Sequence, residues 1–384
     1  MREVLDELLR WWRAGQPVGM ATVTSTWRSA PRPAGATMLV GPDGTAVGSV
    51  SGGCVEADVY ELCQQVRVSG EPRTARYGIS DDDAFAVGLT CGGIIDLFVE
   101  RVDPDNFPEL PEVAAAIAAE RPVATATCIE GPPGRPGRRL VVTADARHGT
   151  LGSARADDAV ADDVRGMLAL GSTGLLHYGV DGQRRGSGLT VMVSAFAPRP
   201  RMIVFGAIDF AAAVARVGAF LKYRVTVCDA RPVFATRRRF PDADEVVVDW
   251  PHRYLAAEAE AGRVDERTVV CVLTHDPKFD VPVLRVALDL PLAYVGAMGS
   301  RRTHDERMTR LREAGVPEPA LARLASPIGL NLGARTPEET AVSIAAEIIA
   351  TRWGGNGMPL SSTTGRIHEH TIVSDPVDQE PSET

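Results

Sequence analysis

The alternation of apolar and polar residues predicts the first elements of the chain. Apolar positions in residues 1–15 have the spacing of an amphipathic helix, and the same spacing predicts a second helix over 54–67. Residues 18–27 and 36–50 alternate as β-strands do, and the sequence GPDG at 41–44 predicts a hairpin turn within the second segment. The chain therefore begins with a helix, antiparallel strands and another helix.

Residues 121–197 continue with short strands and an Ala- and Asp-rich helix near 156–169. Long helices do not alternate with the strands, so this region is predicted to be α+β. The sequence APRPR at 197–201 is typical of a linker. We therefore predict an N-terminal α+β domain over 1–197, with a subdivision near 105–120.

Beyond residue 201 the pattern changes to short, uniformly apolar and β-branched runs separated by helical stretches. Such runs fit strands that are covered on both faces, and they predict a Rossmann-like parallel sheet over 201–353. Thr336, Pro337 and Glu339 predict the start of the last helix, with a capping box. Residues 354–384 are polar, lack periodicity and are predicted to be a disordered tail.

The 384 residues carry a formal net charge of −9. This balance argues against a general nucleic-acid binder, because phosphate binding depends on clustered Lys and Arg. No apolar run approaches the roughly 20 residues that span a bilayer. The first helix contains acidic residues and does not resemble a secretory signal, so we expect a cytoplasmic protein without membrane partners.

The six cysteines are scattered without a CxxC pair, which argues against a disulfide framework or a zinc site. Cys54 and Cys91 differ from the other four because each adjoins Gly-Gly. Cys54 lies at the predicted start of the 54–67 helix, with Ser51 as a candidate cap. Unpaired N–H groups at a helix start attract anions and favour a thiolate, so Cys54 is the candidate functional thiol.

The first βα turn of the predicted parallel sheet is GAIDFA, residues 206–211. Gly206 and Ala211 fit a dinucleotide-binding turn, but Ile208 replaces the second glycine and Asp209 adds a negative charge. Asp229 ends the next strand, where an acid that binds ribose would lie. The turn predicts the fold and also predicts weak or absent NAD(P) binding.

Other candidate site residues lie in loops of both domains. Gly299, Ser300 and Arg301 form a strand-to-helix turn that fits either an anion site or a plain turn with solvated arginines. His275 ends a strand that borders the Gly206 crevice, where it is either functional or a structural hydrogen-bonding group. Arg32, in a proline-rich loop with Arg28, fits either an anion clamp beside Gly52–Cys54 or a rigid surface turn.

Seven segments together resemble the XdhC/CoxI family. They are TSTWRSAPRPAGATM, GSVSGGCVEADV and LTCGGIIDLFVE in the first domain, and DARPVFATRRRFPDAD, LTHDPKFD, YVGAMGSRRTHDERMTRLREAG and SPIGLNLGARTPEETAVSIAAEIIA in the second. The resemblance runs from the first helix to residue 353. The turn GAIDFA departs from the family's common GAGHVA.

Members of this family are accessory proteins of molybdenum hydroxylases such as xanthine dehydrogenase and CO dehydrogenase. The resemblance implies binding of the molybdenum cofactor, a molybdopterin, its protection during sulfuration by a cysteine desulfurase, and its delivery to the apoenzyme. The family's Gly-Gly-Cys falls on Gly52, Gly53 and Cys54, and its Cys-Gly-Gly on Cys91, Gly92 and Gly93. Thiolate ligation of molybdenum would assign Cys54 as the metal contact.

We expect the cofactor to lie between the two domains, or between domains of two subunits in a homodimer, because ligand pockets favour domain interfaces. Cys54 and Arg32 would face the metal end. The second domain would contribute the crevice of Gly206 and His275, with Asp229, Gly299, Ser300 and Arg301 nearby. The alternatives are an NAD(P)-dependent oxidoreductase and a ligand-free scaffold that contacts the molybdoenzyme.

Overall fold

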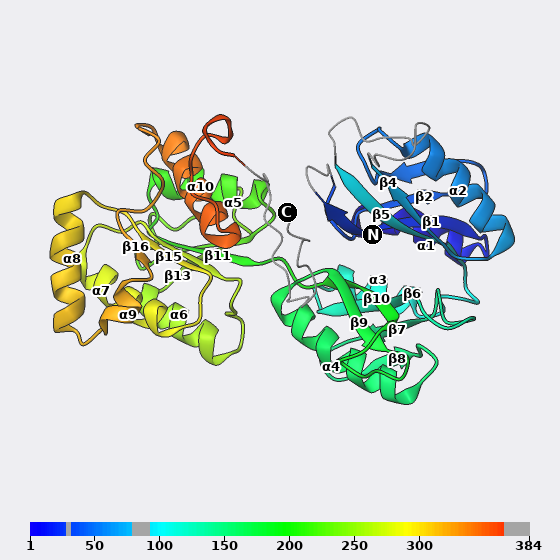
Figure 1. Cartoon of the computed structure of the whole chain (residues 1–384). Helices are drawn as coiled ribbons and strands as arrows, with labels where there is room; N and C mark the ends of the chain where they lie inside the picture. Colours follow the sequence, from blue (N-terminus) through cyan, green and yellow to red (C-terminus); the bar gives the residue numbers. More distant parts are fainter. Residues whose placement is uncertain (28–31, 79–92, 365–384) are drawn as a thin grey trace, which may run out of the picture. The chain divides into compact units, whose positions relative to one another are not determined.

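A computed structural model of the chain describes residues 1–27, 32–78 and 93–364. The chain divides after Pro198 into two compact units (Figure 1). The N-terminal unit comprises Met1–Pro198, and the C-terminal unit comprises Arg199–Thr363. None of the helices within these described ranges is long and apolar enough to cross a membrane.

The described part of the N-terminal unit contains two five-stranded antiparallel sheets, ordered β3-β2-β1-β5-β4 and β8-β7-β6-β10-β9. The first sheet comprises β1 (Val18–Trp27), β2 (Thr37–Val40), β3 (Ala46–Gly48), β4 (Arg73–Tyr77) and β5 (Ile94–Val102). The second comprises β6 (Val123–Glu130), β7 (Arg139–Val142), β8 (Arg147–Gly149), β9 (Gly174–Gly179) and β10 (Gly188–Phe196). The helices are α1 (Leu5–Arg13), α2 (Glu56–Ser69), α3 (Leu110–Ala118) and α4 (Ala154–Leu170).

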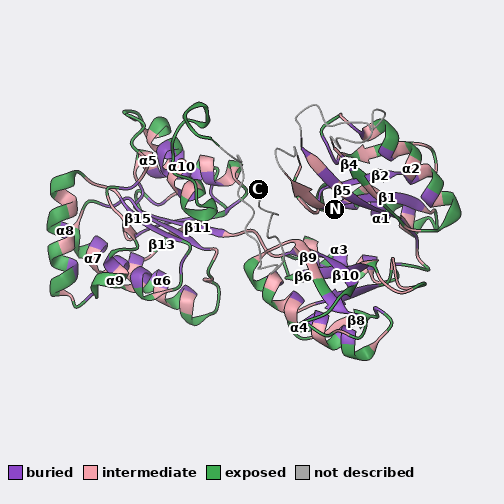
Figure 2. Ribbon diagram, viewed as in Figure 1, coloured by how far each residue is buried: buried purple, intermediate pink, exposed green. Residues whose placement is uncertain are grey.

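Alternation along the strands divides the apolar residues of this unit among three cores. In β1, Ala21 and Val23 pack with α2, whereas Val18 and Met20 contribute to a core shared with α1, α3 and strands of both sheets. In the second sheet, Val191 packs with α4 and Phe196 joins the shared core. Figure 2 shows that burial is concentrated in the strands, while the outer helix faces are exposed. The α+β prediction for this domain is confirmed.

The two halves of the N-terminal unit have the same topology, helix-β-β-β-helix-β-β, with equivalent strand orders. Gly48 and Gly149 both have positive φ, and a Cβ at either would come within 2.3 Å of the carbonyl oxygen of Thr37 and Arg139, respectively. Glycine is therefore required at the same point of each half. We call residues 5–102 repeat 1 and residues 110–196 repeat 2.

Further contacts recur in both repeats. The N–H of Gly35 donates to Val23 O, and the N–H of Gly137 donates to Cys128 O, both at 2.8 Å. A buried strand tyrosine, Tyr77 in repeat 1 and Tyr178 in repeat 2, donates its hydroxyl to an aspartate of the packed helix. The pattern of apolar and polar residues does not reveal this duplication.

The C-terminal unit has a six-stranded parallel sheet ordered β13-β12-β11-β14-β15-β16, which is the Rossmann arrangement. Its strands are β11 (Arg201–Phe205), β12 (Arg224–Asp229), β13 (Glu245–Val248), β14 (Val269–Val272), β15 (Tyr294–Ala297) and β16 (Leu324–Ala325). Its helices are α5 (Asp209–Phe220), α6 (Pro251–Glu260), α7 (Pro277–Asp289), α8 (Arg301–Glu313), α9 (Glu318–Leu321) and α10 (Pro337–Trp353). The Rossmann-like prediction is confirmed.

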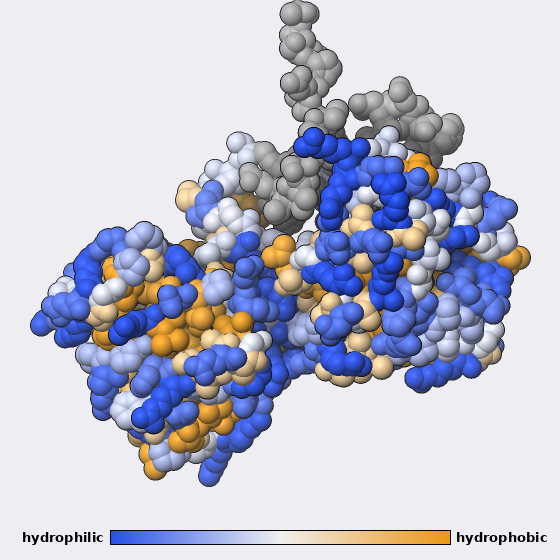
Figure 3. All heavy atoms as spheres, turned by 90° about the horizontal axis from the view of Figure 1, so that it is seen from below, coloured by the Kyte–Doolittle hydropathy of each residue, from blue (hydrophilic) through white to orange (hydrophobic). Residues whose placement is uncertain are grey.

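Two apolar cores cover the faces of this sheet. Residues of α5 and α10 pack on one face, and residues of α6, α7, α8 and α9 pack on the other. The space-filling view shows apolar side chains on the visible face of this unit, at the left (Figure 3). The same unit has a groove between α6, α7 and α9, which is lined in part by the apolar residues Ala256, Val281 and Val316.

Two local predictions have different outcomes. The capping box at Thr336 and Glu339 is present at the start of α10, as the sequence predicts. The helix predicted from residue 54 begins two residues later, at Glu56, so Cys54 lies just before its first turn. The N-cap residue Val55 makes no side-chain cap bond, but the Ser51 hydroxyl accepts from the N–H groups of Cys54 and Val55 at 3.0 and 3.1 Å. Residues 354–364 are exposed and include a short 3₁₀ helix, Leu360–Ser362. The rest of the predicted tail lies outside the described residues.

Candidate functional site

The Gly52–Cys54 loop lies on the surface of repeat 1, directly before α2. Gly52 and Gly53 are exposed, with φ of 76° and 118°, conformations that favour glycine. Among the residues that the structure describes, none has an atom within 4 Å of a Cβ placed at either position, so these residues leave the space above this backbone open. The loop can therefore accept a close ligand approach next to Cys54.

The carboxylate of Glu56 holds this loop in place through hydrogen bonds. Its Oε1 accepts from the Ser49 hydroxyl at 2.6 Å and the Ser51 N–H at 2.9 Å. Its Oε2 accepts from the Gly53 N–H at 2.8 Å, the Val55 N–H at 3.3 Å and the Ser51 hydroxyl. Although burial acts to raise the pKa of Glu56, these hydrogen bonds lower it to about 2.

This arrangement corrects the expectation that the loop N–H groups are open to an external anion. The N–H of Gly52 donates to Ser49 Oγ and that of Cys54 donates to Ser51 Oγ, while the other donors bind Glu56. The N–H groups of Ser51, Gly53 and Val55 thus bind an internal carboxylate. Sequence reasoning missed Glu56, because its role depends on the path of the loop around it.

Cys54 differs from the other described cysteines in exposure. Cys54 is partly exposed, whereas Cys63, Cys128, Cys228 and Cys271 are buried. Burial raises the pKa of Cys63 and of Cys271 to about 12, and of Cys128 to about 11. These buried thiols are poor nucleophiles and metal ligands at neutral pH.

We expect a thiol-reactive probe to label Cys54 first. Iodoacetamide at pH 7, followed by peptide mass spectrometry over time, measures the rate at each cysteine. The physical reason is that Cys54 is partly exposed and sits on an open loop, whereas the described alternatives are buried. Faster labelling of Cys63 or Cys228 would contradict this assignment.

The remaining N-terminal candidates are distributed as follows. Arg32 forms an ion pair with Glu3 at 2.7 Å, and its side chain is one-third exposed. Gly93 is buried directly before β5. Cys91, Gly92 and Arg28 lie outside the described residues.

In the C-terminal unit, Gly206 lies at the carboxyl end of β11, beside the end of β14. Its φ is 110°, and a Cβ there would lie 3.0 Å from the Thr274 backbone nitrogen. Glycine therefore permits the close approach of the two strand ends. His275 follows Thr274 and is exposed, so it lies at the same edge of the sheet as Gly206.

Asp229, at the end of β12, is bonded within the protein. Its Oδ2 accepts from the Ala207 N–H at 2.7 Å, and both oxygens accept from the Arg231 guanidinium. Although burial acts to raise it, the pKa of Asp229 is lowered by the hydrogen bonds from Arg231 and Ala207. Ribose hydroxyls would have to compete with these existing bonds.

We accordingly expect no NADH binding at micromolar concentrations. Ile208 stands at the N-cap of α5, in place of the glycine that admits a pyrophosphate, and Asp209 follows it at the first helical position. A fluorescence titration with NADH measures this directly, with the variant Ile208→Gly/Asp209→His as the comparison. Saturable micromolar binding by the native chain would contradict the prediction.

The third glycine turn joins β15 to α8. Ser300 is the N-cap of α8, and its hydroxyl oxygen accepts from the Thr303 N–H at 3.1 Å. Gly299 has a φ of 157°, and a Cβ there would lie 3.0 Å from Thr303 Cβ. Arg301 is exposed at the first helical position, where its guanidinium can reach an anion near the helix start.

A buried ionic network joins the elements behind this edge of the sheet. Arg307 of α8 donates to Asp280 Oδ2 at 3.0 Å and to Met298 O at 2.7 Å, and Thr274 donates its hydroxyl to Asp280. Burial raises the pKa of Asp280 despite these bonds. The network fixes the segments that carry His275 and Gly299.

Comparison with known proteins matches most of the chain to one family. A model described as the XdhC Rossmann domain matches residues 202–348. A model described as the XdhC and CoxI family matches residues 11–78 and 116–179, one segment in each repeat.

Three similar proteins extend over nearly the whole chain. One, from Bacillus subtilis, is named as a probable xanthine dehydrogenase subunit; it is 29% identical over 87% of this chain and 92% of its own length. Another, named molybdenum cofactor insertion chaperone PaoD, from Escherichia coli, is 26% identical over 88% of this chain and 85% of its own length. A crystal structure titled as a xanthine dehydrogenase from Bacillus halodurans is 27% identical, with a TM-score of 0.65, over 94% of this chain and 97% of that one.

Proposed function

Because the chain belongs to the XdhC and CoxI family, we propose that it binds the molybdenum cofactor and delivers it to an apoenzyme of the xanthine dehydrogenase type. The observation that carries the proposal is the match to a relative named as a molybdenum cofactor insertion chaperone, which spans 85% of that relative. In this role the protein is an accessory factor and does not turn over a substrate. A cysteine desulfurase that supplies the terminal sulfur would be a second partner.

The residues around Cys54 fit the metal end of such a cofactor. Molybdenum is soft enough to accept a thiolate, and Cys54 is partly exposed on a loop where the described residues leave open space above Gly52 and Gly53. We propose that Cys54 contacts the metal or its sulfur ligand and shields it until transfer. Glu56 holds the loop that carries this thiol in one conformation.

The cofactor also carries a phosphate, which needs N–H or guanidinium donors. The loop N–H groups of repeat 1 are bound to Glu56 and to Ser51, so they do not supply these donors. Arg301 and the α8 start are the better candidates, because Arg301 is exposed at the first helical position. We propose that Arg301 binds the phosphate.

The test is co-purification of molybdopterin with the full chain from cells that make it. We expect Cys54→Ala to lose activation of a client enzyme, and Arg301→Ala to lower cofactor affinity about tenfold to a hundredfold. Arg302→Ala is the matched control, because Arg302 is exposed beside Arg301 and pairs with Glu306. Absence of molybdopterin from the native preparation would contradict the proposal.

A further inference from the structure

Two loops of repeat 2, which follow strands equivalent to those before the Arg32 and Cys54 loops of repeat 1, border a second candidate site. In repeat 1 the β1–β2 loop and the β3–α2 loop carry Arg32 and Cys54. Their counterparts in repeat 2 are the β6–β7 loop, which is followed by Arg139 at the start of β7, and the β8–α4 loop with Thr150. These two loops of repeat 2 line a cleft with the end of β5 and the segment before α3.

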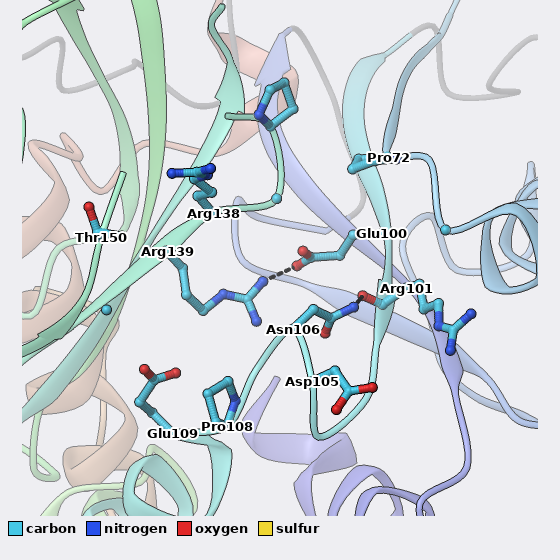
Figure 4. A pocket seen from close by; sticks show the side chains of 14 residues that line it. Pro72, Glu100, Arg101, Asp105, Asn106, Pro108, Glu109, Arg138, Arg139 and Thr150 are labelled. Carbon is cyan, nitrogen blue, oxygen red and sulfur yellow. Dashed lines mark hydrogen bonds and ion pairs between the residues drawn. The ribbon is translucent and has the colours of Figure 1, made fainter. Parts of the chain in front are cut away.

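The cleft has a cavity volume of about 380 Å³, within the range of small-molecule sites. Figure 4 shows Glu100 from repeat 1 and Arg139 from repeat 2 pointing toward one another across it. Arg101, Asn106 and Glu109 border the same space. Both repeats therefore contribute polar side chains to one cavity.

The guanidinium of Arg139 indicates that this cleft takes a ligand and is not only a contact between the two repeats. Its side chain is 3% exposed and pairs with Glu100, with its guanidinium 3.9 Å from the centre of the Phe107 ring. Among the described atoms, its Nε and Nη1 are buried and have no hydrogen-bond partner. In repeat 1 the corresponding residue is Thr37, whose carbonyl oxygen contacts Gly48 as that of Arg139 contacts Gly149. A buried guanidinium with unmet donors is unfavourable unless an acceptor joins it.

The charges that line the cleft define the chemistry of its ligand. Arg139 pairs with Glu100, and Arg101 pairs with Asp103. The lining has equal numbers of arginines and carboxylates and so carries no large net charge: Arg101, Arg138 and Arg139, with Glu100, Asp105 and Glu109. A bare anion would meet the carboxylates, and a cation would meet the arginines. A neutral molecule that presents a carbonyl oxygen to Arg139 and N–H groups to the carboxylates satisfies both.

We propose that this inter-repeat cleft binds a small planar heterocycle with a cyclic amide edge, the chemistry shared by pterins and oxopurines. Glu100 and Glu109 accept from the N–H groups of the ring, and Arg139 donates to its carbonyl oxygen. The choice of a pterin as the ligand rests on the proposed function. The site itself rests on the cavity, the unpartnered guanidinium nitrogens and the duplication.

The experiment titrates the purified full chain with pterin (2-amino-4-oxopteridine), followed by its fluorescence, and with hypoxanthine as the oxopurine competitor. We expect saturable pterin binding that weakens about tenfold or more in Glu109→Gln and in the charge-balanced double variant Arg139→Met/Glu100→Leu. Glu112→Gln, a change in the helix that directly follows Glu109 and at a residue outside the cleft lining, should bind as the native chain does. Thermal unfolding of each variant establishes that it is folded.

The outcomes separate this inference from the proposed function. No pterin or hypoxanthine binding by the native chain, or equal binding by Glu109→Gln and the double variant, overturns the cleft site. Tighter binding of hypoxanthine retains the cyclic-amide site and overturns the pterin as its ligand. Pterin binding in the cleft without co-purified molybdopterin overturns the proposed function and retains the cleft site. Co-purification of molybdopterin that these variants do not change retains the proposed function and overturns the cleft site.

Discussion

Replacing Glu56 with glutamine is expected to lower the free energy of unfolding by about 2 kcal/mol at neutral pH and to accelerate alkylation of Cys54. The carboxylate accepts hydrogen bonds from Ser49, Ser51, Gly53 and Val55, and each bond to a charged acceptor contributes about 1.5–3 kcal/mol before losses from non-additivity. An amide keeps the size of the side chain but exchanges one acceptor oxygen for an N–H donor. The loop that carries Cys54 is then no longer held in one conformation.

The pH dependence of unfolding gives this prediction a second readout. The pKa of Glu56 is about 2 in the folded chain, below its ordinary value of 4.5. The contribution of this carboxylate to stability is therefore fully present above about pH 5 and is lost as the pH falls through about 2. Denaturant titrations between these pH values should show a steeper loss of stability for the native chain than for Glu56→Gln.

Asp157 supplies the matched control from repeat 2. It accepts from the Thr150 hydroxyl at 2.8 Å and the Leu151 N–H at 2.7 Å, so it holds the loop before α4 as Glu56 holds the loop before α2. We expect Asp157→Asn to lower stability without changing the alkylation rate of Cys54. Equal alkylation rates for the native chain and Glu56→Gln would show that Glu56 does not position the thiol.

The sequence predicts the fold well because local patterns determine most of its elements. Alternation over residues 18–27 matches β1, and the apolar runs after residue 201 match the parallel strands. The capping box at Thr336 predicts the start of α10 from three residues. Each of these signals arises from side chains that are close in the sequence and bury one face.

The duplication is harder to detect from the sequence, because equivalent positions of the two repeats share backbone geometry more often than they share the same residue. Gly48 and Gly149 match because a side chain would strike the neighbouring strand, and the carboxylates of Glu56 and Asp157 differ in length. Alternating strands in both repeats predict sheets but do not reveal that the sheets are equivalent. Thr37 and Arg139 occupy corresponding positions and have unlike side chains, which hides the relation further.

The candidate site is predicted only in outline for a related reason. Gly206 and His275 do lie at one edge of the parallel sheet, as strand order requires. The internal bonding of Asp229 and of the Gly52–Cys54 loop depends on partners that the sequence does not place. Arg307 appears in a highly charged helix, where solvation is the ordinary outcome, and only the packing of α7 against α8 buries it.

Replacing Arg307 with methionine is expected to lower the free energy of unfolding by about 3–5 kcal/mol, because it leaves the buried carboxylate of Asp280 without its cation. The exposed fractions of the Arg307 and Asp280 side chains are 2% and 6%. The substitution also removes the donors to Met298 O and to the Ser326 hydroxyl. Chemical denaturation at pH 7 measures the loss.

The double variant Arg307→Met/Asp280→Asn tests whether the loss of stability comes from the unpaired carboxylate of Asp280. The asparagine is neutral and can still bond Thr274, so we expect the double variant to recover about half or more of the loss. Arg302→Ala on the exposed face of the same helix should cost less than about 0.5 kcal/mol, because its pair with Glu306 is solvated. If the double variant is no more stable than Arg307→Met, the loss comes from the missing contacts to Met298 and Ser326. The network would then act through packing of the β15–α8 turn, and Asp280 would not be the source of its stability.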